Sequence, residues 1–257
     1  MNTINLTAPR KYADMTEKQV RYIAMLQVSG TPEENIWTKC LIRFTGIKPI
    51  VQVRDKYFFV KKGLKGFFTL TVEEVTYFSK KMDFLTRHYV GFKPFHRVGR
   101  YVPCMTLFEN VRFLQYLEAE NYYQAYIFTK NEKHLHLLMA TLYGRKGEKY
   151  DNNRTERRAR YFKKRSAVEK MSTVMWIIGV KEYFSRKFPD LFDSAESGDS
   201  STPPDMYEII QNQIRILNNG DVTKREKVLN SLTWDALHEM NAKIKESKEL
   251  AKQMKTT

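Results

Sequence analysis

Few side chains in this sequence are placed to do metal or acid–base chemistry. His134 and His136 stand two positions apart on an expected helix, about 200° apart around its axis, so they cannot share a metal ion. His88 and His96 have no second carboxylate or cysteine at ligand spacing. The His238-Glu239 pair has no serine or cysteine nucleophile in a recognisable context. We therefore expect no catalytic and no metal-binding residues.

The common cofactor and hydrolase motifs are also missing from the sequence. It contains no G-x-x-x-x-G-K-[ST], G-x-G-x-x-G, G-x-S-x-G or H-E-x-x-H pattern. Cys40 and Cys104 are the only cysteines and lie far apart in the chain, which predicts small buried side chains in a reducing compartment instead of a disulfide framework. We expect a protein that is not an enzyme and needs no cofactor.

Positive charge is the strongest chemical signal. The 257 residues carry a formal net charge of +15 with a pI near 9.6, a balance that favours polyanions or acidic protein surfaces as partners. The first basic zone, residues 54–100, contains Arg54, Lys56, Lys61, Lys62, Lys65, Lys80, Lys81, Arg87, Lys93, Arg97 and Arg100. The second, residues 145–165, contains Arg145, Lys146, Lys149, Arg154, Arg157, Arg158, Arg160, Lys163, Lys164 and Arg165.

Two interpretations of this charge stay open. In the first, a set of cations in the second zone neutralises phosphates and neighbouring aromatic rings stack on bases; the candidate polyanion-binding residues are Arg154, Arg157, Arg158, Lys163, Lys164 and Arg165. In the second, the basic faces are solvated or meet an acidic protein, and the aromatic rings turn inward as core. Helical and strand periodicity alone accounts for those rings.

Helix-capping signals and changes of apolar period predict the elements around these residues. Capping boxes at Thr16, Thr31, Thr71 and Thr223 predict helix starts, and Gly30 alone joins the first two helices. After the second helix and before the Thr71 capping box, the apolar period changes to that of strands. This change predicts a small antiparallel meander over about 50–70. The predicted fold class is α+β, predominantly α-helical.

A helix over 166–187 is expected at the centre of the fold. Around 175–180 its apolar residues go nearly all the way round, which is typical of a helix surrounded by protein. We take Trp176, Ile177 and Phe184 as structural core, and Pro189 as the helix stop.

Composition also predicts the division of the chain. Residues 1–192 read as a helical body that holds the meander, 193–205 as a flexible acidic linker, and 206–257 as a C-terminal helical segment whose last turns, 246–255, fray. The longest apolar run is far shorter than the roughly 20 residues of a membrane span, so we expect a cytoplasmic protein that does not contact membranes.

Four segments carry a family resemblance: 7–22, 40–46, 176–189 and 213–243, which include Cys40-Leu41-Ile42-Arg43-Phe44-Thr45-Gly46 and Trp234-Asp235-Ala236-Leu237. They resemble uncharacterised proteins of about this length from phage and prophage structural-gene modules of gut Bacteroidetes, in the tail-assembly region. The match covers both ends and the central helix, and 48–165 only loosely. The resemblance implies no activity but a context, tail or particle assembly.

This context sets the leading functional hypothesis. A helical factor there would most resemble a tail assembly chaperone or a minor structural protein, which acts by protein–protein interaction with other phage structural or assembly proteins in the host cytoplasm or in the virion. The alternative is a nucleic-acid-binding protein that uses the basic surfaces around 54–100 and 145–165.

Overall fold

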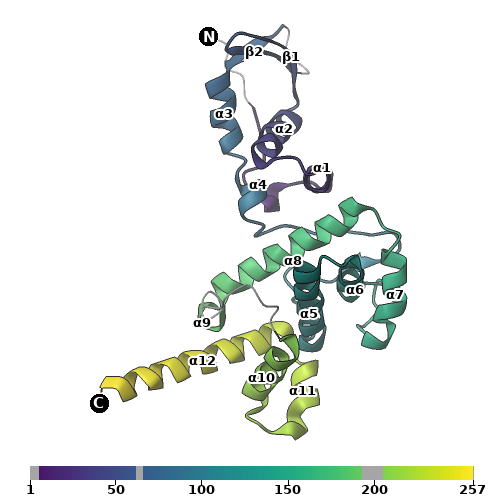
Figure 1. The fold of residues 1–257 in the computed structure, drawn as a ribbon, viewed down its shortest axis with the longest axis vertical. Helices are drawn as coiled ribbons and strands as arrows, with labels where there is room; N and C mark the ends of the chain where they lie inside the picture. Colours follow the sequence, from purple (N-terminus) through teal and green to yellow (C-terminus); the bar gives the residue numbers. More distant parts are fainter. Residues whose placement is uncertain (1–5, 62–65, 193–204, 257) are drawn as a thin grey trace. The chain divides into compact units, whose positions relative to one another are not determined.

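The computed structural model describes residues 6–61, 66–192 and 205–256 and is predominantly helical with two small antiparallel sheets (Figure 1). It divides into two compact units. Unit 1 comprises Met1–Lys93 and Ala167–Gly179, and unit 2 comprises Pro94–Ser166 and Val180–Thr257. This division differs from the predicted one, because residues 94–166 group with the C-terminal helices. Lys62, Lys65 and almost all of the predicted acidic linker lie outside the described residues.

Unit 1 begins with a helical pair. The capping box at Thr16 forms, with Gln19 as its partner, and starts α1 (Glu17–Val28). The second predicted box does not form: α2 (Glu33–Thr45) starts one residue later than expected, with Pro32 at the N-cap and no side-chain cap. Proline's fixed φ suits the entry into a helix, so the start needs no hydroxyl at residue 31. The two helices contact each other, and residues 29–32 connect them instead of Gly30 alone.

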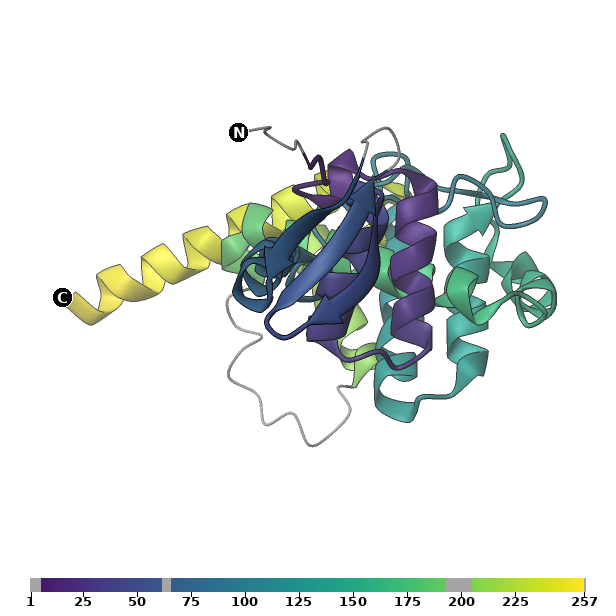
Figure 2. The same cartoon turned by 90° about the horizontal axis from the view of Figure 1, so that it is seen from above.

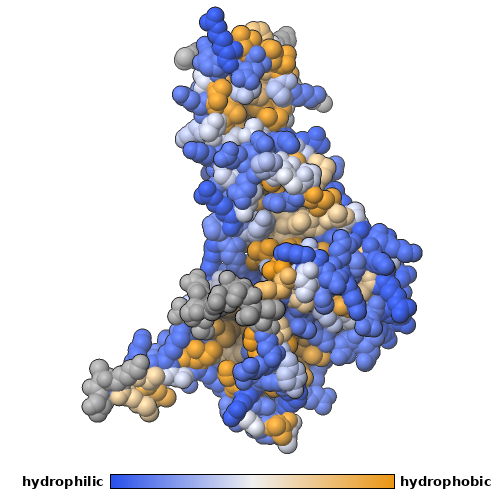
Figure 3. Space-filling view, in the orientation of Figure 1, coloured by the Kyte–Doolittle hydropathy of each residue, from blue (hydrophilic) through white to orange (hydrophobic). Residues whose placement is uncertain are grey.

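The predicted meander is present in unit 1. Strands β1 (Ile47–Val53), β2 (Lys56–Lys61) and β3 (Phe68–Thr71) pair antiparallel in that order and lie side by side (Figure 2). The capping box at Thr71 then starts α3 (Val72–Lys80), and α4 (Phe84–Arg87) follows. One sheet face is covered, since Phe59 is buried against Phe68. The exposed apolar residues of β1 contribute to hydrophobic surface over the sheet (Figure 3).

Aromatic and backbone contacts pack the short helix η1 and the first half of α8 into the core of unit 1. Tyr12 of the short helix η1 (Tyr12–Asp14) is buried and donates its hydroxyl to the carbonyl of Leu85 at 2.7 Å. The first half of α8 (Ala167–Lys187) also belongs here: Trp176 and Ile177 are fully buried. A Cβ at Gly179 would collide with the backbone of Tyr89, so this glycine permits a close approach of the chain to the helix.

Unit 2 contains the remaining helices and a second sheet. Its elements are β4 (Val102–Pro103), α5 (Phe113–Thr129), α6 (Glu132–Leu142), β5 (Tyr143–Gly144), η2 (Asn152–Arg154), α7 (Thr155–Phe162), the end of α8, α9 (Pro189–Phe192), α10 (Met206–Asn218), η4 (Val222–Lys224), α11 (Arg225–Asn230) and α12 (Thr233–Thr256). Strands β4 and β5 pair antiparallel, and the sequence did not predict them because each is only two residues long.

An aromatic cluster forms the core of unit 2. Phe184, predicted as core, is fully buried, and its ring lies 5.6 Å from that of Trp234 and 6.1 Å from that of Tyr116. Phe188 packs on the same tryptophan at 5.8 Å. These edge-to-face contacts join the end of α8 to α5 and α12.

The sequence after the capping-box signal at Thr223 predicts one helix, but the structure has two, α11 and α12. Thr233 donates its backbone N–H and its hydroxyl to the Val111 carbonyl at the start of α12. The last turns are helical to Thr256. Lys248 supports them, because its ammonium contacts the Asp190 carboxylate of α9 at 3.6 Å.

Candidate polyanion-binding site

A hollow of about 320 Å³ in unit 2 brings together most of the arginines of the second basic zone. Its lining is Arg100, Tyr101, Arg145, Glu148, Arg154, Arg157, Arg158 and Tyr161. Three segments supply these residues: the chain before β4, the chain after β5, and the η2–α7 segment. Five guanidinium groups face a single carboxylate there, so the hollow carries a strong excess of positive charge.

The basic residues of the η2–α7 segment line two separate pockets. Arg154, Arg157, Arg158 and Tyr161 recur at three-to-four spacing and line the hollow. Arg160 and Lys163 do not line the hollow but a separate pocket, together with Glu156 and residues of α6. The surface around α7 is largely hydrophilic (Figure 3).

Arg158 holds α7 in place. Its side chain is only 5% exposed, and Nη1 donates to the carbonyls of Ala140 at 2.9 Å and Tyr143 at 3.3 Å. Nη2 lies 3.4 Å from the Glu148 carboxylate. These carbonyls belong to the end of α6 and the start of β5, so Arg158 links α7 to that junction. Its Nη1 and Nη2 groups bond to partners within the protein.

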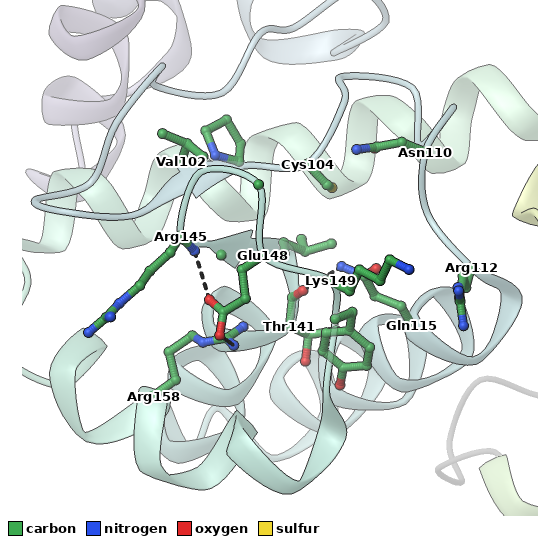
Figure 4. Close-up of a pocket in the computed structure, with 15 residues that line it drawn as sticks. Val102, Cys104, Asn110, Arg112, Gln115, Thr141, Arg145, Glu148, Lys149 and Arg158 are labelled. Carbon is green, nitrogen blue, oxygen red and sulfur yellow. Dashed lines mark hydrogen bonds and ion pairs between the residues drawn. The ribbon is translucent and has the colours of Figure 1, made fainter. Parts of the chain in front are cut away.

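Glu148 organises the arginines around it. Its carboxylate accepts the backbone N–H of Arg145 at 3.0 Å and contacts Arg154 at 3.1 Å, and it lies between Arg145 and Arg158 (Figure 4). The Arg145 N–H, with help from the guanidinium groups of Arg158 and Arg154, lowers the pKa of the Glu148 carboxyl below its ordinary value. It is therefore ionised at neutral pH and closes the loop after β5 onto α7.

Two tyrosines form the aromatic part of the hollow. The guanidinium carbon of Arg100 lies 5.3 Å from both the Tyr101 and the Tyr161 ring centroids, and that of Arg165 lies 4.5 Å from the Tyr161 centroid. Gly99 permits this packing, since it adopts φ +60° and a Cβ there would collide with the Tyr161 hydroxyl. The Nε atom of Arg165 is buried without a hydrogen-bond partner.

Only some of the six predicted polyanion-binding residues lie at the hollow. Arg154 and Arg157 are exposed at the hollow, whereas Arg158 lines it but is committed to internal partners. Arg165 does not line the hollow but packs on the ring of Tyr161, which does. Of the two lysines, Lys163 lines the separate pocket, and Lys164 is exposed outside the lining.

Arg100 and Arg145 belong to the hollow and were not among the predicted binding residues. Both are exposed, and their guanidinium groups have no acidic partner in the described part of the chain. Arg100 belongs to the first basic zone of the sequence. Its proximity to α7 depends on the chain before β4, whose pairing with β5 spans about forty residues of sequence and leaves no local signal.

Neither a metal-ligand cluster nor a membrane-spanning helix is found among the described residues. Among residues 6–61, 66–192 and 205–256, no group of three or more histidine, cysteine or acidic residues is placed to hold a metal ion. Within those same ranges, no helix is both long enough and apolar enough to span a membrane.

The comparisons with known proteins give no match. No protein-family model matches the chain, and no curated protein or solved structure does either. The phage-module resemblance is thus neither supported nor contradicted by them, and functional inference depends on the geometry of the hollow.

Proposed function

We propose that this protein binds nucleic acid through the arginine hollow of unit 2. The observation that supports this proposal is the convergence of five arginines and two tyrosines on one hollow of about 320 Å³, with one carboxylate among them. Guanidinium groups present a planar fork of donors that matches phosphate oxygens, and this geometry distinguishes arginine from lysine as a phosphate ligand.

The arginines have separate tasks in this proposal. Arg100, Arg145 and Arg157 are exposed and have no acidic partner among the described residues, so they contact phosphate. Arg154 is shared with Glu148 and Asp151, at 3.1 Å and 3.0 Å, and supplies charge at the rim. Arg158 does not contact the ligand and instead fixes α7. The net charge of +15 adds a long-range attraction for polyanions.

Two arginines of α7 provide a matched test. Arg157 lines the hollow, while Arg160, three residues further along and also exposed, lines the separate pocket beside α6. Binding of labelled DNA and RNA is measured at about 50 and 200 mM salt for Arg157→Ala and Arg160→Ala. We expect Arg157→Ala to weaken binding about tenfold and to reduce the salt dependence by about one phosphate contact. Equal effects of the two substitutions would show that charge acts without a site.

Phage particle assembly is a second proposal, supported by a different surface. Leu250 and Met254 of α12 are 56% and 79% exposed and lie four residues apart, so they form an apolar ridge near the end of the helix. Such a ridge suits contact with another helical protein. Co-purification with a tail-tube or tape-measure protein from induced cells, abolished by Leu250→Asp with Met254→Asp, would support it. Retention of that partner by the double variant would contradict it.

A further inference from the structure

A second hollow adjoins the arginine hollow. It has a volume of about 310 Å³ and shares Arg145, Glu148 and Arg158 with its neighbour. Arg145 and Arg158 lie at one end of it and Arg112 at the other (Figure 4). Each hollow has the size of a small-molecule pocket, for which about 300–1,000 Å³ is usual. A ligand that occupies the first therefore has room to extend into the second.

The second hollow is lined by both apolar and polar side chains. Val102, Pro103 and Leu142 provide apolar walls from β4 and the end of α6. Tyr150 lines it with an aromatic ring whose hydroxyl is anchored by Glu118 and, at 3.1 Å, by Thr155. An anchored ring beside apolar walls suits the faces of a nucleobase, because bases stack on aromatic side chains whatever their sequence.

Gln115 supplies a fixed polar group in the same hollow. The residue is only 8% exposed, and its Nε2 donates to the Thr141 carbonyl at 2.7 Å. This bond identifies which end of the amide is nitrogen, and it leaves Oε1 as an acceptor that no described residue uses. This oxygen is not among the buried unpartnered polar atoms of the described residues, so it is accessible in the hollow, where the exocyclic amino group of a base can donate to it.

We propose that the ligand is single-stranded nucleic acid, with one phosphate in the arginine hollow and the attached unpaired base in the second hollow at Gln115. This inference rests on the proposed function, since the phosphate must first occupy the arginine hollow. It excludes a duplex from the second hollow, because a paired and stacked base cannot enter a pocket lined from α5, α6 and both strands of the β4–β5 sheet.

Gly144 offers a way to fill the second hollow without touching the arginines. It lines the pocket in β5, and a Cβ there would meet nothing closer than the Glu148 carbonyl at 4.0 Å. Gly144→Val therefore places a branched side chain into open space, in a strand that tolerates it. Gln115→Leu removes the acceptor at nearly constant volume and serves as a second variant.

The test measures fluorescence anisotropy with short labelled DNA single strands, RNA single strands of the same sequence, and the DNA duplex, at about 200 mM salt. We expect the wild-type protein to bind single strands about tenfold more tightly than duplex. Gly144→Val and Gln115→Leu should abolish this preference and leave duplex binding intact. Arg157→Ala should weaken all three. The DNA and RNA arms show which sugar the site accepts.

A competition experiment on the wild-type chain depends on no variant's folding. Adenosine monophosphate and cytidine monophosphate, each with an exocyclic amino group, should displace the labelled strand at concentrations at least about tenfold below those of inorganic phosphate. Equal competition by phosphate, or equal affinity for strand and duplex, would overturn the base pocket. If neither Arg157→Ala nor phosphate affects binding, the arginine hollow itself is rejected.

Discussion

The two basic zones of the chain differ in how the fold uses their charges. Cations of the first zone that lie in unit 1 meet separate local neighbours: Lys81 covers the Tyr77 ring at 4.6 Å, and Arg87 lies 3.3 Å from the Asp83 carboxylate. Arginines of the second zone converge on one hollow in unit 2. The contrast teaches that charge density along the sequence does not make a site, whereas convergence from several elements does.

Arginine content separates the zones as well. The described cations of the first zone in unit 1 are mostly lysines. The cations that line the hollow in unit 2 are all arginines. A lysine is a flexible point charge that stays well hydrated, while arginine stacks on rings and holds a fork of donors in one plane. The hollow, and not the part of the first zone in unit 1, is thus equipped to hold a phosphate in a defined orientation.

The largest expected effect is that of Trp176→Ala, which should lower the stability of the protein without changing its affinity for nucleic acid. Trp176→Ala removes a fully buried ring from the part of α8 in unit 1 and should cost about 3–5 kcal/mol of unfolding free energy. The arginine hollow contains no residue of unit 1, so the affinity of the remaining folded protein for nucleic acid should not change. Thermal unfolding and binding below the transition check both parts. An unchanged melting temperature would contradict the assignment of Trp176 to the core.

A smaller effect comes from two glycines with matched backbone angles. Gly99 in unit 2 has φ +60° and Gly30 in unit 1 has φ +65°, so alanine at either should cost about 1–2 kcal/mol. A Cβ at Gly99 also displaces Tyr161, whereas at Gly30 it meets nothing within 4 Å. Gly99→Ala alone should therefore weaken nucleic-acid binding several-fold. Equal binding by both variants would remove Tyr161 from the site.

The smallest effect is a pH-dependent one at Glu148. Its folded pKa lies below the ordinary value of 4.5, so its stabilisation is fully present above that value and is lost as the pH falls through the folded pKa. Glu148→Gln should cost about 1 kcal/mol at pH 7, as expected for a half-buried ion pair. Melting temperatures of variant and wild type should converge below pH 4.5. A constant difference across the pH range would show that the carboxylate charge is not involved.

Local patterns predicted much of the fold. The capping boxes at Thr16 and Thr71 have side-chain and backbone partners within three residues, so the sequence alone contains the whole signal. The meander and the helix over 166–187 likewise follow from apolar period. The β4–β5 pair was missed because it joins residues distant in sequence through very short strands.

The candidate site was predicted only in part, for the same reason. Arg154 and Arg157 lie on one contiguous run and could be selected from it. Arg100 and Arg145 reach the hollow through tertiary structure. Arg158 looked equivalent to its neighbours, yet it is buried and bonded to two carbonyls, and nothing in a basic run distinguishes a buried arginine from an exposed one. The helical spacing of α7 would have separated Lys163 from Arg157.

Two triple variants that remove the same charge test most directly whether nucleic acid binds at the arginine hollow. One replaces Arg100, Arg145 and Arg157 of the hollow by alanine, and the other replaces Lys56, Lys61 and Lys80 of unit 1. Affinity for single-stranded DNA is measured from about 50 to 200 mM salt. The hollow variant should lose about a hundredfold or more in affinity and most of the salt slope, and the lysine variant only a few-fold. Equal losses in the two variants would show that the net charge, and not the hollow, determines binding.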